Sequence, residues 1–251
     1  MQCDRKHVLL TGTSSGIGKA TMEAALAQGF HVFAGDRSNT SARGGAVPAD
    51  ETLTKIHLDI TKAEDIAAAV TMIDEHVGDV GLDALANIAG IGIPGPLEIM
   101  PMESLRASFE VDFFGQVALT QPLIPLLRKA GGRIIFIGSV VDRTTIPFFG
   151  ALASSKSAIA AVSGTLRQEL APWGIDVVLV EPGFISTGAD KATKARMDKL
   201  IEDFSPSEEA LYGEMFRTST ARGYKTQTSG SSPDGVADVI LEAITSSKPK
   251  D

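Results

Sequence analysis

The sequence has 251 residues, of which 43% are hydrophobic, and a net charge of −8 at pH 7. That length and apolar content suffice for one core of α/β layers, while the acidic balance argues against nucleic acid and anionic membranes as partners. The single cysteine, Cys3, excludes an internal disulfide, and no apolar run reaches the roughly 18 residues of a membrane span. The polar start of the chain does not resemble a signal peptide, so we expect a cytoplasmic protein.

Short apolar runs and stretches of helical spacing alternate along the chain. The predicted strands are the apolar runs, at His7–Thr11, His31–Gly35, Lys55–Ile60, Asp83–Ile88, Arg133–Gly138 and Ile175–Val180. The predicted helices lie between them, at Gly16–Gln28, Thr61–Gly78, Met102–Lys129 and Gly150–Leu170. Runs such as Ile134–Ile137 and Val177–Val180 are continuously apolar instead of alternating, which is typical of strands buried on both faces of a parallel sheet. The pattern therefore predicts a single α/β domain over residues 1–251, a doubly wound Rossmann-type fold with six or seven parallel strands.

Local signals set the ends of two helices and the shape of a third. Gly29 is a suitable stop for the first helix. Thr61 and Glu64 have the spacing of a capping box, which predicts that the second helix begins there. Pro122 and Pro125 are expected to bend the third helix.

Two polar segments interrupt the alternation. Residues Arg37–Ala49 are rich in Ser, Gly and Ala and are predicted to form a loop. Residues Gly188–Ser231 follow a strand end directly and carry scattered apolar side chains. We interpret this second segment as a lid over a substrate site, with an ordinary surface insertion as the alternative.

A glycine-rich turn joins the first predicted strand to the first predicted helix. Gly12, Gly16 and Gly18 allow the backbone to approach a pyrophosphate, and the amides of the first helical turn then point at the phosphates. Ser14 and Ser15 add hydroxyl groups. The turn between strand and helix therefore predicts a dinucleotide site.

An acidic residue ends the second strand, 18 residues after Gly18. A carboxylate at this place, Asp36, accepts hydrogen bonds from the ribose hydroxyls and repels a 2′-phosphate, which favours NAD over NADP. Arg37 is the counter-argument, because a guanidinium can pair with a 2′-phosphate or stack on adenine.

The segment Thr11–Gly18, with the sequence TGTSSGIG, resembles the TGxxxGIG signature of the short-chain dehydrogenase/reductase family. The likeness extends along the whole chain and is greatest to the hydroxysteroid and retinol dehydrogenase branch. It implies a cofactor site built from Gly12, Ser14, Ser15, Gly16, Ile17, Gly18, Asp36, Arg37, Asp59, Ile60, Asn87, Ala89, Gly90, Lys156, Pro182, Gly183, Ile185 and Thr187. Relatives usually continue into a seventh strand, so the sheet edge is shorter here or the sequence is truncated.

The family's chemistry uses a Tyr-x-x-x-Lys pair, and here the pair is incomplete. The resemblance places Ser139 as the residue that orients the substrate and Lys156 as the residue that binds the ribose and lowers the tyrosine pKa. Leu152 stands where the tyrosine is expected, and the chain's two tyrosines, Tyr212 and Tyr224, lie in the predicted lid. Where the family has a catalytic Asn this chain has Asp112, which offers Lys156 a direct ion pair.

A leucine exchanges no proton, so binding is better supported than turnover. The first hypothesis is an oxidoreductase that moves hydride between NAD(H) and a secondary alcohol or ketone, with water or Asp112 replacing the missing hydroxyl. The substrate is expected to be lipophilic, because an apolar pocket is predicted from Val140, Val141, Ile146, Phe148, Phe149, Leu152 and Phe184. The alternatives are an NAD-binding pseudoenzyme or inactivated variant and, more weakly, a dehydratase or isomerase. Lys156 as a Schiff-base nucleophile is a further option.

Besides a small-molecule substrate, the only partners that we expect are further copies of the same chain. Family members usually pair through the two long helices, so a homodimer or homotetramer is predicted. No cluster of His, Cys and carboxylate residues has metal-ligand spacing, and no metal is expected.

Overall fold

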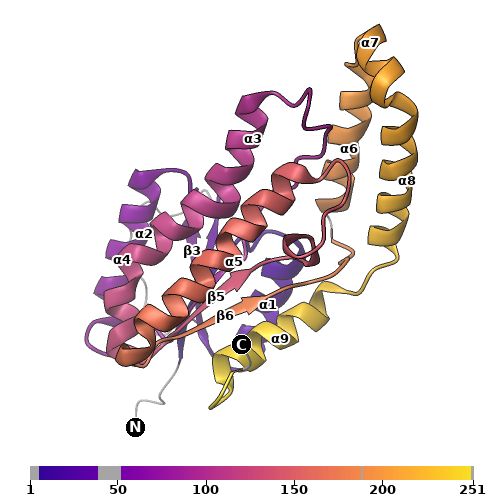
Figure 1. Cartoon of the computed structure of the whole chain (residues 1–251). Helices are drawn as coiled ribbons and strands as arrows, with labels where there is room; N and C mark the ends of the chain where they lie inside the picture. The colour runs from indigo at the N-terminus through magenta and orange to yellow at the C-terminus, as the bar shows by residue number, and fades with distance from the viewer. Residues whose placement is uncertain (1–5, 39–51, 188, 250–251) are drawn as a thin grey trace.

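The protein was analysed as a computed structural model, which describes residues 6–38, 52–187 and 189–249. The predicted loop at Arg37–Ala49 therefore lies almost wholly outside the described residues. The described part contains a six-stranded parallel sheet in the order β3-β2-β1-β4-β5-β6, which confirms the doubly wound fold (Figure 1). The strands are β1 (His7–Thr11), β2 (His31–Asp36), β3 (Leu53–His57), β4 (Ala84–Asn87), β5 (Arg133–Ile137) and β6 (Asp176–Val180).

Helices cover both faces of the sheet. One layer contains α1 (Gly16–Ala27) and α9 (Pro233–Thr245), and the other contains α2 (Ala63–Val77), α4 (Gly115–Ala130) and α5 (Gly150–Leu170) (Figure 1). Successive strand residues alternate between the two cores: Leu9 of β1 packs with the α2–α4–α5 layer, whereas Val8 and Leu10 pack with the α1–α9 layer. Burial on both faces explains why the inner strands are mostly apolar, whereas the edge strand β3 alternates between buried residues and residues open to solvent.

The glycine stop predicted for the first helix is confirmed, whereas the capping box is wrong. Gly29 has φ +81° and donates its amide to the Leu26 carbonyl just after α1. Thr61 does not cap α2, because its amide and hydroxyl both donate to Asp59 Oδ1, at 3.0 and 2.7 Å. The aspartate turn before the helix therefore uses the hydroxyl that the capping box required, and the helix begins two residues later at Ala63.

The long helix predicted over residues 102–129 is interrupted, but not at its prolines. It consists of α3 (Met102–Phe109), a π-helical turn (Glu110–Phe114) and α4, and Pro122 and Pro125 both lie inside α4. A π-helical turn inserts one residue into the helical ladder and redirects the side chains that follow. Here the turn contains Asp112, which is completely buried beneath the carboxyl edge of the sheet.

The segment predicted as a lid is mostly helical. It contains α6 (Ala189–Glu202), α7 (Pro206–Glu208) and α8 (Glu214–Thr228), and α6 and α8 stand side by side beyond the end of β6 (Figure 1). The two ends of the segment meet where Ser231 donates its amide to the Phe184 carbonyl, at 3.1 Å. In the described residues no helix has the length and apolarity needed to cross a membrane.

Candidate functional site

The turn after β1 leaves no room for a side chain at Gly12 or Gly18. Gly12 has φ +70°, and a Cβ atom there would lie 3.0 Å from the Ala89 Cα. A Cβ atom on Gly18 would lie 2.1 Å from the Gly12 carbonyl oxygen. Ser15 precedes α1 without capping it through its side chain, so the amides of the first turn point into the groove free of such a cap. This arrangement suits a pyrophosphate, which needs close backbone approach and amide donors.

Thr11 ties this turn to the end of β4. Its hydroxyl oxygen accepts hydrogen bonds from the amides of Ile88 and Ala89, at 2.9 and 3.0 Å. The side chain is almost fully buried, so these bonds form away from competing water. The two loops that face each other across the groove are therefore held at a fixed distance.

Asp36 lies at the end of β2 with both carboxylate oxygens in hydrogen bonds. Oδ2 accepts from the Ser14 amide at 3.2 Å, and Oδ1 accepts from the amide and hydroxyl of Ser38 at 2.8 and 2.6 Å. Partial burial alone would raise the pKa of Asp36, but the bonds from Ser38 and Ser14 outweigh burial and lower it. The groove therefore presents an ionised carboxylate at the end of β2, the place where Rossmann-type folds bind the adenosine ribose of a dinucleotide.

The structure brings nearly all the predicted cofactor residues into one groove along the carboxyl edge of the sheet. The members that line it are Gly12, Ser14, Ser15, Gly16, Ile17, Gly18, Asp36, Arg37, Asp59, Ile60, Ala89, Gly90, Lys156, Pro182, Gly183, Ile185 and Thr187. Asn87 is the exception, because its fully buried amide donates to Thr120 Oγ1 of α4 at 3.0 Å and does not reach the groove. Its side chain therefore joins β4 to α4 and does not line the groove.

Lys156 lies on α5 beneath the groove. Its ammonium group donates to the Ile137 carbonyl at the end of β5, at 2.7 Å. Burial lowers the pKa of Lys156, and the nearby Asp112 opposes that shift by Coulomb attraction. The hydrogen bond to Ile137 therefore fixes the Lys156 side chain at the floor of the groove.

Asp112 does not form the direct ion pair with Lys156 that the sequence suggested. Its Oδ1 accepts from the Ile91 amide at 2.9 Å, and its Oδ2 accepts from the Ser108 hydroxyl at 3.2 Å. No ion pair within the described ranges joins Asp112 to Lys156; both groups converge on Gly90, where a Cβ atom would lie 2.8 Å from Asp112 Oδ1 and 3.6 Å from Lys156 Nζ. Burial raises the pKa of Asp112, against the attraction of Lys156.

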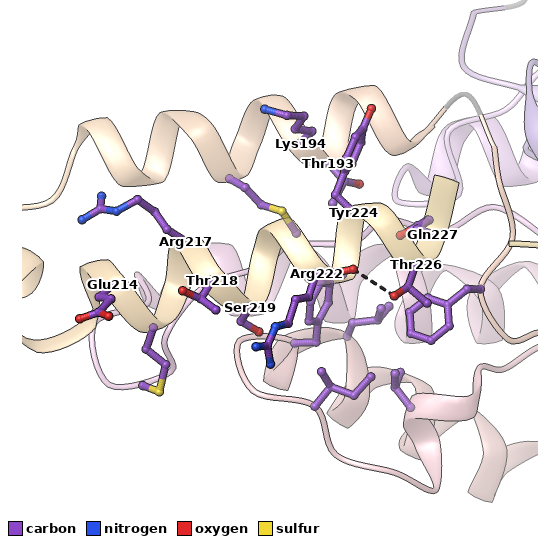
Figure 2. Close-up of a pocket in the computed structure, with 18 of the residues that line it drawn as sticks. Thr193, Lys194, Glu214, Arg217, Thr218, Ser219, Arg222, Tyr224, Thr226 and Gln227 are labelled. Carbon is purple, nitrogen blue, oxygen red and sulfur yellow. Dashed lines mark hydrogen bonds between the residues drawn. The ribbon is translucent and has the colours of Figure 1, made fainter. Parts of the chain in front are cut away.

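Leu152, at the position where the resemblance led us to expect a tyrosine, lies on the wall of the groove. It lies one helical turn before Lys156 on α5 and lines the groove together with Ser139. Neither tyrosine replaces it, because Tyr212 donates its hydroxyl to Glu98 and the Tyr224 ring lies on the side of α8 that faces α6 (Figure 2). Among the described residues that line the groove there are therefore a hydroxyl, at Ser139, and an amine, at Lys156, but no phenol; Tyr224 lines only the neighbouring cavity.

A second cavity of about 930 Å³ opens between α8 and the loops after β5 and β6. Its walls include six of the seven predicted apolar residues, namely Val140, Val141, Ile146, Phe149, Leu152 and Phe184. The seventh, Phe148, is buried beside it and packs edge-on against Phe216 of α8, with ring centroids 5.0 Å apart. The cavity and the groove share Ser139, Phe149, Leu152, Gly183, Thr193 and Gln227. A molecule in the cavity therefore meets the groove at Ser139 and Leu152.

Two groove residues from the lid segment, Thr193 and Gln227, carry no recognisable signal in the sequence. They reach the groove only because α6 and α8 fold back over the end of the sheet. Ile91 and Gly92 also line the groove, and their position directly after Gly90 was a usable signal.

Comparison with known proteins agrees with this geometry. The sequence model of the short chain dehydrogenase family matches residues 6–198. Over 98% of the chain, the sequence is 35% identical to an NADPH-dependent 3-dehydrocapnine reductase of Ornithobacterium rhinotracheale, covering 86% of that protein. It is 32% identical over the same share to retinol dehydrogenase 16 of Mus musculus, covering 78% of that protein. A solved short-chain dehydrogenase from Streptomyces avermitilis superposes with a TM-score of 0.77 at 28% identity, over 98% of this chain and 87% of that one.

Proposed function

Because this chain belongs to the short-chain dehydrogenase family, a family of oxidoreductases, we propose that it transfers hydride between NAD(H) and the carbonyl carbon of a lipophilic ketone or the corresponding alcohol. The observation that carries the proposal is the meeting of groove and cavity at Ser139 and Leu152. When bound, the dinucleotide supplies or accepts the hydride. The glycine turn, the unoccupied amides of α1 and the ionised Asp36 fit its phosphate and ribose groups.

The chain's own residues divide the remaining work. Ser139 lines both the groove and the cavity, so its hydroxyl would donate a hydrogen bond to the substrate oxygen. Lys156 is held by the Ile137 carbonyl and provides donors and positive charge at the ribose. Leu152 moves no proton, so water that enters through the open cavity would protonate the substrate oxygen. Turnover should then be slow, because a positioned acid is typically worth about 10²–10⁴ in rate.

We propose NAD(H) as the preferred cofactor, because Asp36 would repel a 2′-phosphate. Arg37 lines the same groove and would attract that phosphate, and one relative is named as NADPH-dependent. We give Asp36 the greater weight, since hydrogen bonds hold its carboxylate at the end of β2.

A lipophilic substrate is supported by the apolar wall of the cavity. Val140, Ile146 and Phe184 lie on the side of the loops, while Met197 and Met215 come from the lid segment. Burial of apolar substrate surface against these side chains would contribute roughly 25 cal/mol for each Å².

Leu152 also favours a second candidate function, a dinucleotide-binding protein without catalysis. In that case NADH would still bind, but no ketone would be reduced. The test is NADH oxidation followed by absorbance across a panel of aliphatic ketones, after binding of NADH has been demonstrated. Oxidation above the enzyme-free rate supports the oxidoreductase; binding without oxidation of NADH by any ketone supports the second candidate.

We further propose one domain, a cytoplasmic location and a homodimer or homotetramer whose subunits pair through the two long helical segments, α3–α4 and α5. The supporting feature is the run Ala158–Ser163 on α5, whose small side chains allow another helix to approach closely. Light scattering coupled to size-exclusion chromatography would measure the mass, and a monomer at micromolar concentration contradicts both the dimer and the tetramer.

A further inference from the structure

The lid helices give one side of the cavity a polar and charged surface. Its cations are Arg217 and Arg222 from α8 and Lys194 from α6, and two carboxylates, Glu209 and Glu214, also line the cavity. Glu214 lies at the start of α8, eight residues before Arg222. A cavity meant only for a neutral hydrocarbon would gain nothing from these cations, because a polar group without a partner lowers the affinity for apolar ligands. Their presence raises the question of which of them is available to a ligand.

Two of the three cations are already neutralised. Arg217 pairs with Glu209, which also lines the cavity. Lys194 pairs with Asp198 one turn further along α6, at 2.5 Å. Arg222 differs, because among the side chains of residues 6–38, 52–187 and 193–249 no carboxylate forms an ion pair with it and no acceptor receives a hydrogen bond from its guanidinium.

A hydroxyl accompanies Arg222 on the same face of the helix. Ser219 lies three residues before Arg222, so the two side chains are neighbours on the surface of α8. Figure 2 shows both side chains directed from α8 toward the loops across the cavity, whereas Tyr224 is directed toward α6. In the described part of the chain the Ser219 hydroxyl also has no hydrogen-bond partner. Arg222 and Ser219 together therefore present several unused donors to the same space.

We propose that the substrate carries an anionic oxygen group, a carboxylate, sulfonate or phosphate, which Arg222 binds with help from Ser219. The inference rests on the proposed function and names its substrate class: an amphipathic keto compound with its carbonyl at Ser139 and its acidic end at α8. The apolar wall between these points, formed by residues such as Ile146 and Phe149, would contact the intervening hydrocarbon. Guanidinium and hydroxyl donors recognise such oxygens through charge-assisted hydrogen bonds.

The test compares four probes that differ only at one end. Methyl nonyl ketone is matched with the keto acid in which its terminal methyl is a carboxylate, and with the corresponding sulfonate and phosphate. Binding is measured by calorimetry at constant ionic strength, with and without saturating NADH, so that no turnover is required. The variants are Arg222→Gln, Ser219→Ala and, as the matched control, Lys225→Gln, which removes a cation of α8 that does not line the cavity.

We expect at least one acidic probe to bind about tenfold more tightly than the ketone. Arg222→Gln should abolish this preference, Ser219→Ala should reduce it, and Lys225→Gln should leave it unchanged. Equal binding of all probes overturns the inference, as does a preference that survives Arg222→Gln or is lost equally in Lys225→Gln. Failure of NADH to bind, with the Arg222-dependent preference intact, overturns the proposed cofactor chemistry and leaves the anion site standing.

Discussion

Replacement of Leu152 by tyrosine is the substitution whose effect on turnover follows most directly from the structure. Leu152 lines both the groove and the cavity, one turn before Lys156 on the same face of α5. A phenol at this position enters the open cavity of about 930 Å³, so its larger side chain is accommodated without overpacking the core. Its hydroxyl would share the space beside Ser139, and the Lys156 charge would lower the tyrosine pKa.

The expected gain is the usual worth of a positioned acid or base. A factor of about 10²–10⁴ in kcat corresponds to about 2.7–5.4 kcal/mol in the barrier. We expect the lower part of this range for Leu152→Tyr alone, because Asp112 remains in place of the family's asparagine. Adding Asp112→Asn should raise the rate further.

The assay is NADH oxidation with a saturating aliphatic ketone, compared among the native chain, Leu152→Tyr and Leu152→Phe. Leu152→Phe is the matched control, because it adds the ring without the hydroxyl. NADH affinity should be the same in all three proteins. If Leu152→Tyr turns over no faster than Leu152→Phe while both bind NADH, the assignment of this position to proton transfer is refuted.

Three further substitutions test the groove. Gly18→Ala should weaken NADH binding at least about tenfold in a fluorescence titration, because its Cβ would lie 2.1 Å from the Gly12 carbonyl oxygen. Gly235→Ala is the control, because a Cβ atom there meets nothing within 4 Å. Equal loss of NADH affinity in the two variants would contradict the need for close backbone approach at Gly18. Asp36→Asn should raise NADPH affinity relative to NADH about tenfold in paired titrations, and an unchanged ratio would show that the carboxylate does not select the cofactor. Asp112→Asn removes a Coulomb attraction that raises the pKa of Lys156, so Lys156 should lose its proton at lower pH. The pH above which NADH binding declines should therefore fall. A rise in that pH would contradict the attraction between Asp112 and Lys156.

The parts of the site that local sequence determines were predicted well. The glycine turn, Asp36 and the Leu152–Lys156 spacing depend on one strand end or one helix face, and all of them line the groove. The doubly wound sheet was also predictable, because burial on both faces leaves continuous apolar runs in the inner strands, as in β1 and β5.

The parts that depend on tertiary packing were not predictable. Asn87 directly precedes the groove residues Ile88, Ala89 and Gly90, yet its side chain turns inward to Thr120, more than thirty residues further along the chain. The π-helical turn around Asp112 has no local signal in the sequence. The helix was expected to bend at Pro122 and Pro125, but it is interrupted at the π-helical turn before them. Arg222 belongs to a polar helix, and only the folding of α8 over the cavity distinguishes it from other exposed cations.

The most direct test of the account is a titration of the native chain with NADH and with NADPH, followed by nicotinamide fluorescence. Trp173 is a poor reporter, because it is 56% exposed, stacks with Arg128 and precedes β6 at the sheet edge opposite the groove. The account predicts saturable binding of both dinucleotides in one site, with NADH the tighter. Absence of binding would contradict the cofactor groove, and equal or tighter binding of NADPH would contradict the selection by Asp36.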